Sequence, residues 1–74
     1  MPAERDPRLD PMPGDVLRYT TSLKCITTER RVISVSARKV VYRQNDCFNI
    51  DDWRNEWKRW AATAEVISRA EEQS

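Results

Sequence analysis

Apolar and polar residues alternate in three short runs in the first half of the chain. The runs are VLRYTT at 16–21, the segment 26–36, which ends in RVISVS, and KVVYRQ at 39–44. β-Branched and aromatic residues are frequent in all three, which predicts strands. The links between the runs are too short for a crossover helix, and 36–39 has room only for a hairpin turn. The pattern therefore predicts an antiparallel meander that starts after the turn Pro13-Gly14-Asp15.

From residue 48 the apolar spacing becomes that of a helix. Separations of three and four residues place one set on a single face: Ile50, Trp53, Trp57, Trp60, Ala64 and Ile67. Asn49 stands where a helix N-cap is expected, and Phe48 and Trp53 then occupy the two positions of a hydrophobic staple. The pattern predicts a Trp-rich amphipathic helix that starts after Asn49, with Trp53 buried.

The end of this helix has two interpretations. Periodicity alone continues it to about Ala70, because no helix breaker follows Trp60. The β-branched pair Val66-Ile67 instead favours a closing strand over 65–68, which would cover one edge of the sheet. We prefer the short helix followed by the closing strand.

The N-terminal residues differ in composition from the rest. All four prolines lie in the first thirteen positions, among charged residues and few apolar ones. Such a segment buries too little surface to offset its ordering entropy. We therefore expect a mobile arm over 1–12, a single domain over 13–70 and a frayed tail over 71–74. The fold class is α+β, with a small antiparallel sheet of three or four strands packed against one helix, and with closure into a barrel as a variant.

Several short segments carry a resemblance to known proteins. Pro13-Gly14-Asp15-Val16 and the strands 31–35 and 40–43 resemble the opening of SH3-like or KOW-type small barrels. The whole run, which ends in Trp57-Lys58-Arg59-Trp60-Ala61 and Ala64-Glu65-Val66-Ile67, is similar to short uncharacterised prophage proteins of proteobacteria. The chain differs from KOW elements in lacking a glycine in the second loop. The resemblance implies a phage-encoded accessory protein in the cytoplasm of a bacterial host, and it supplies no catalytic residue.

The composition argues against catalysis and metal binding. Histidine, the most frequent general acid or base, is absent, and a single glycine cannot build a phosphate-binding loop. Asp51 and Asp52 are adjacent and do not face each other on a helix. Cys25 and Cys47 supply only half of a tetrahedral zinc site. No apolar run reaches the length of a signal peptide or a membrane span. We expect a cytoplasmic protein that is not an enzyme, without cofactor, metal or membrane partner.

Cations are frequent in the body of the chain. Between residues 16 and 68 there are ten cations and six anions, although the whole chain has a net charge of only +1. A candidate nucleic-acid surface consists of Arg30, Arg31, Arg38, Lys39 and Arg43. The same residues are also typical of solvated outward positions on a small sheet, and we favour this interpretation.

The three tryptophans provide the second candidate surface. At least two are expected to pack in the core, across a sheet face made by Val16, Ile33, Val35 and Val41. One partly exposed indole would then anchor a partner. The candidate contact residues are Trp57, Trp60 and Tyr42. The sequence thus predicts a small module that binds an unidentified protein, with weak, sequence-tolerant nucleic-acid binding as the alternative.

Overall fold

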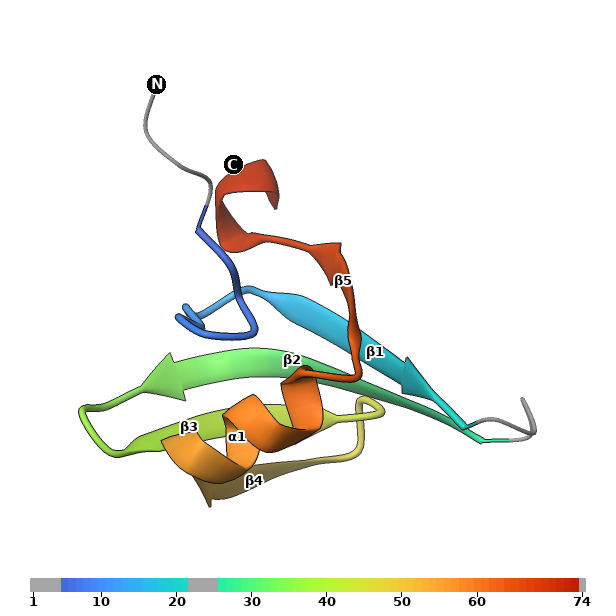
Figure 1. Ribbon diagram of the computed structural model, residues 1–74, viewed down its shortest axis with the longest axis horizontal. Coiled ribbons are helices and arrows are strands. Elements are labelled where there is room, and N and C mark those ends of the chain that lie inside the picture. The colour runs from blue at the N-terminus through green and yellow to red at the C-terminus, as the bar shows by residue number, and fades with distance from the viewer. Residues whose placement is uncertain (1–4, 22–25, 74) are drawn as a thin grey trace.

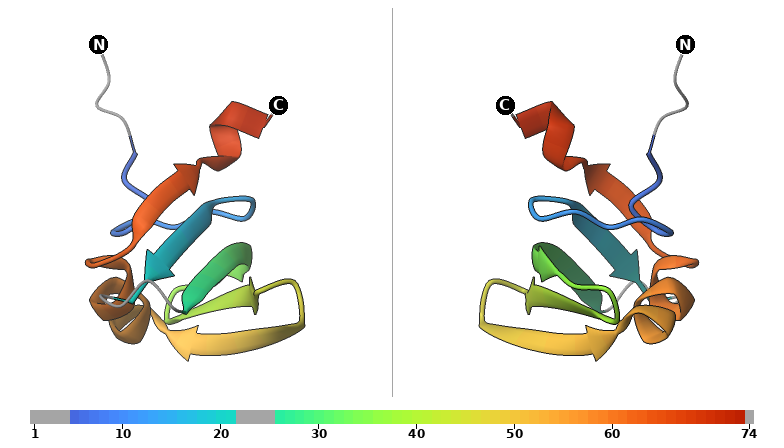
Figure 2. Two further views of the ribbon diagram at one scale, coloured as in Figure 1. Left: turned by 90° about the vertical axis from the view of Figure 1, so that its right-hand side faces the viewer. Right: turned by 90° about the vertical axis from the view of Figure 1, so that its left-hand side faces the viewer.

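The computed structural model describes residues 5–21 and 26–73, in which five strands form one antiparallel sheet with a single α-helix on it (Figure 1). In chain order the elements are β1 (Val16–Thr20), β2 (Thr27–Val35), β3 (Lys39–Gln44), β4 (Phe48–Trp53), α1 (Arg54–Ala61), β5 (Glu65–Ser68) and the 3-10 helix η1 (Ala70–Gln73). The strand order is β4-β3-β2-β1-β5. The α+β class and the three-strand meander are confirmed, whereas the sheet stays open between β4 and β5 and forms no closed barrel within the described chain (Figure 2).

Residues 48–53 form the strand β4, so the prediction of a helix starting after Asn49 is wrong. Each residue of β4 pairs with one of β3, from Gln44↔Phe48 to Lys39↔Trp53. The three-residue loop 45–47 between the strands has positive φ at Asn45 (50°) and Asp46 (62°), and the Cys47 N–H donates to the Gln44 carbonyl oxygen at 3.0 Å, as in a type I′ turn. Backbone pairing in this hairpin overrides the helical spacing of the side chains.

The start of α1 differs from the prediction accordingly. Trp53 occupies the N-cap position and makes no side-chain capping bond within the described chain, while Asn49 pairs with Arg43 in the sheet. Phe48 and Trp53, the expected staple, are exposed by 61% and 55%. The short helix and the closing strand are confirmed, because β5 pairs antiparallel with β1.

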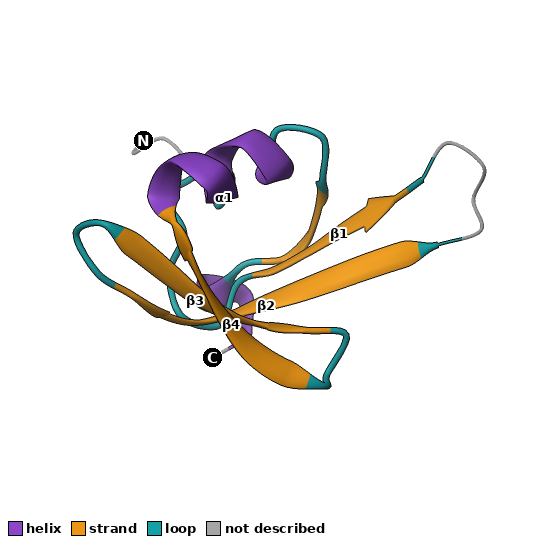
Figure 3. Ribbon diagram, turned by 90° about the horizontal axis from the view of Figure 1, so that it is seen from below, coloured by secondary structure: helices purple, strands orange, loops and turns teal. Residues whose placement is uncertain are grey.

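The core lies between α1 and one face of the sheet (Figure 3). Its buried members are Leu17, Val32, Val40, Tyr42, Trp57, Ala61 and Ala64. This set differs from the predicted Val16, Ile33, Val35 and Val41. The register of β2 against β3 shifts between Val32 and Ser34, so Ile33 is the extra residue of a bulge and is 41% exposed. Of the predicted set, Val16 is buried outside this cluster and Val35 packs against it.

The N-terminal residues pack against the domain over 5–12, contrary to the expected free arm; residues 1–4 lie outside the described residues. Pro7 and Pro11 are buried, and the indole Nε1 of Trp57 donates a hydrogen bond of 3.1 Å to the carbonyl oxygen of Pro7. The Nε of Arg8 donates to the Ala64 carbonyl oxygen at 3.0 Å. Composition missed this packing because the segment contributes prolines and backbone carbonyls instead of large apolar side chains.

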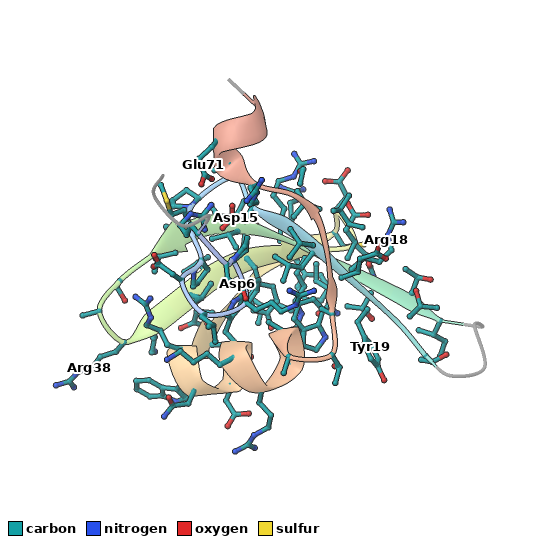
Figure 4. All side chains as sticks on the ribbon, turned by 45° about the horizontal axis from the view of Figure 1, so that its top comes forward. Asp6, Asp15, Arg18, Tyr19, Arg38 and Glu71 are labelled. Carbon is teal, nitrogen blue, oxygen red and sulfur yellow. The ribbon has the colours of Figure 1, made fainter. Side chains whose placement is uncertain are left out.

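The carboxylate of Asp15 joins the two ends of the chain. It is fully buried and accepts two hydrogen bonds from Arg5, at 2.6 and 2.7 Å, and one each from the backbone N–H groups of Met12 (2.7 Å) and Ala70 (2.8 Å). Burial alone would raise the pKa of Asp15, but these hydrogen bonds outweigh it and hold the pKa below its usual value. Arg5 also donates to the Glu71 carboxylate at 3.3 Å, so the predicted frayed tail is held at its first residue. Glu71 lies near Asp15 (Figure 4).

Candidate interaction surface

The three tryptophans lie in three different environments. Trp57 is fully buried, and Trp60 is half-buried with its ring centroid 5.5 Å from that of Trp57. Trp53 is 55% exposed. Two indoles therefore belong to the core and its margin, as expected, but the exposed one is Trp53. Of the predicted contact residues, Trp57 and Tyr42 are buried and offer no surface to a partner.

Trp53 borders a hollow of about 290 Å³ at the junction of β4 and α1. The hollow is lined by Ala37, Arg38, Trp53, Arg54 and Asn55. Two of these residues come from the β2–β3 turn and two from the first turn of α1. Hairpin pairing along β4 brings the two segments together, because it places Trp53 opposite Lys39.

Hydrogen bonds to backbone carbonyl oxygens hold the walls of this hollow in place. The N–H of Arg54 donates to the carbonyl oxygen of Arg38 at 2.8 Å, and Arg54 Nη1 donates to that of Ser36 at 2.9 Å. The turn is closed by the Ser36 N–H, which donates to the Lys39 carbonyl oxygen at 2.9 Å. Lys39 Nζ lies 4.8 Å from the centroid of the Trp53 ring. The exposed indole is therefore part of a pre-organised surface.

The electrostatic character of the hollow is positive. Its described lining includes two guanidinium groups and no carboxylate. Two neighbouring cations are paired with acids: Arg54 forms an ion pair with Asp10 at 3.9 Å, and Lys39 pairs with Asp51 at 3.1 Å. Arg38 is exposed, makes no ion pair with a described residue and extends away from the body of the protein (Figure 4). A ligand here meets an aromatic face beside a free cation.

The five cations of the predicted nucleic-acid surface are not brought together. Arg31 and Arg43 are exposed cross-strand neighbours, whereas Arg30 points to the core face and lies over the rings of Tyr42 (4.3 Å) and Trp60 (4.2 Å). Burial lowers the pKa of Arg30. Arg38 and Lys39 lie beside Trp53. Arg38 is remote from Arg18 (Figure 4).

A second hollow, of about 540 Å³, contains both signs of charge. Its lining comprises Arg18, Thr20, Thr27, Glu29, Arg31, Arg43, Asn45 and Asp46. Two of its arginines are already paired, Arg18 with Glu29 at 3.2 Å and Arg43 with Asp46 at 3.6 Å. These carboxylates oppose the approach of a polyanion, so this surface is less suited to nucleic acid than the count of cations suggests.

The described residues provide no group of three or more acidic or cysteine side chains that could hold a metal ion. Asp51 and Asp52 point to opposite sides of β4, one to Lys39 and the other to the hydroxyl of Tyr42, which donates at 3.3 Å. Cys47 is exposed, and Cys25 lies outside the described residues. No helix in the described chain is long and apolar enough to cross a membrane.

No family model, curated protein or solved structure matches this chain. The resemblance to SH3-like prophage proteins stays a prediction, and the candidate site rests on the geometry above. Trp53 is the site residue that sequence reasoning missed. Its signal was the Asn45-Asp46 pair, a hairpin turn that makes residues 48–53 a strand and places Trp53 at its end.

Proposed function

We propose that the protein is a non-catalytic module that binds another protein through Trp53 and the hollow beside it. The exposure of Trp53 is the observation that carries this proposal. Exposing more than half of an indole gives up apolar burial that a small core needs. Other large apolar residues of the chain could occupy an exposed position at a smaller loss of burial. Tryptophan beside a formed cavity is the residue type that most often anchors a protein interface.

The rigidity of the surface supports the same function. An indole has few rotatable bonds, and here its ring is flanked by Lys39 and by a turn closed by hydrogen bonds. Ordering such a surface on binding costs little conformational entropy. Nucleic-acid binding is the weaker alternative, because the cations are divided among three places and two of them are paired with acids. A phage or prophage origin is a prediction of the resemblance alone.

Affinity capture with matched variants tests this proposal. The immobilised protein is exposed to nuclease-treated lysate of cells that produce it naturally, in parallel with Trp53→Ala and Phe48→Ala. Phe48 is the matched control, since it is an exposed aromatic residue at the opposite end of β4. We expect proteins that are captured by the wild type and Phe48→Ala and lost with Trp53→Ala. Captured proteins that the wild type and both variants retain equally would contradict the proposal.

A further inference from the structure

We infer that the partner presents an acidic side chain, Asp or Glu, next to an apolar residue, and that this carboxylate binds between Arg38 and Asn55 while the apolar residue packs on Trp53. The inference rests on the proposed function and specifies the chemistry of its ligand. It starts from the composition of the hollow, which combines two guanidinium groups, one carboxamide and one indole.

Charge complementarity identifies the acid. A guanidinium forms two parallel hydrogen bonds to a carboxylate, and such charge-assisted bonds are stronger than neutral ones. Arg54 donates to the Ser36 carbonyl oxygen and is paired with Asp10, whereas Arg38 makes no ion pair among the residues described. The guanidinium of Arg38 is therefore available to a ligand. Lys39 and Arg54 are paired with Asp51 and Asp10, so Arg38 carries the positive charge that would repel a basic partner residue.

The acids on β4 indicate where the ligand does not bind. Asp51 and Asp52 occupy the middle of this edge strand, and charged residues there discourage the pairing of an added strand. An acidic segment that lay along the strand would also approach these two carboxylates. The ligand therefore binds at the Trp53 end through side chains, without extending the sheet.

An array of random octapeptides provides the test, with the wild type, Trp53→Ala, Arg38→Gln and Arg43→Gln as probes. Arg43→Gln is the matched control, because it removes an exposed arginine outside the hollow. We expect the wild type to select peptides with Asp or Glu beside an apolar residue. Replacing that acid by its amide, or using Arg38→Gln, weakens binding about tenfold, while Arg43→Gln binds normally.

Each other outcome overturns the inference about the acid, and one of them overturns the proposed function too. Peptides whose binding depends on Trp53 but not on an acidic residue contradict the inference of a bound carboxylate and leave the proposed function intact. If no selected peptide depends on Trp53, the proposed function fails as well.

Self-association of the free protein that Trp53→Ala abolishes would show that the surface binds a second copy. Displacement of the peptides by oligo(dT) that depends on Arg38 would assign the surface to nucleic acid. Either of the last two results also refutes the inference.

Discussion

At the scale of single residues, the burial of a tryptophan is decided by the element that contains it. Trp53 and Trp57 are four residues apart, and a continuous helix would place both on one face. Because Trp53 ends a strand and Trp57 lies within α1, one indole is exposed and the other fully buried. The periodicity correctly placed Trp57 and Trp60 on the core side of a helix. It could not show that the first two members of the stripe, Ile50 and Trp53, belong to the sheet.

This difference predicts opposite results for two alanine variants. Trp57→Ala removes a large side chain from the core together with the hydrogen bond to Pro7, and should cost about 3–5 kcal/mol. Trp53→Ala removes a mostly exposed ring and should cost less than about 1 kcal/mol. Urea unfolding followed by circular dichroism measures both values. If Trp53→Ala were as destabilising as Trp57→Ala, the assignment of the two environments would be wrong.

The buried carboxylate of Asp15 predicts a pH dependence of stability. Its pKa lies below the usual value in the folded protein, so the stabilisation is present above about pH 4, the unfolded pKa, and is lost as the pH falls through the folded pKa. The unfolding free energy, measured from neutral to acidic pH, should decrease as the pH falls below about 4. Asp15→Asn should flatten that decline, while Glu71→Gln, which alters an exposed acid, should leave most of it. An equally steep decline in Asp15→Asn refutes this role.

At the scale of elements, the sequence predicted β1, β2, β3 and β5 closely but assigned β4 to the helix. Asp51 and Asp52 disfavour a strand, and the apolar spacing from Ile50 onward fits a helix. The turn at Asn45 and Asp46 favours a hairpin, and the choice was settled by the six residue pairs of β4 with β3. Strand pairing of this kind is a tertiary contact, and the local order of apolar and polar residues carries no information about it. The packing of residues 5–12 was missed for the same reason.

Deleting residues 1–12 should therefore destabilise the protein, although composition alone predicted no effect. The deletion leaves the Asp15 carboxylate buried without Arg5 and removes the Pro7 acceptor of Trp57. Breaking a buried ion pair typically costs about 3–5 kcal/mol. Urea unfolding of the truncated and full chains measures the loss, and Leu9→Ala, at an exposed position of the same segment, is the control. Equal midpoints for the truncated and full chains would show that the segment contributes nothing.

At the scale of the whole molecule, the distribution of charge limits nucleic-acid binding. The net charge is only +1, and the candidate cations lie on different faces. We expect weak binding of oligo(dT), with a slope of log K against log salt no steeper than about −2, as two or three phosphate contacts would give. Fluorescence anisotropy over a range of salt concentrations measures the slope. A slope steeper than about −3 would require most of the five cations to contact phosphate together.

The central claim, that Trp53 is the indole that meets the partner, is tested most directly by the three indole N–H signals in ¹H–¹⁵N NMR spectra. The signals are assigned by single Trp→Phe variants and followed while a peptide selected on the array is added. We predict that the Trp53 signal shifts with saturation and that those of Trp57, bonded to Pro7, and Trp60 stay in place. Saturable binding that leaves the Trp53 signal unmoved and shifts either of the others would contradict the claim.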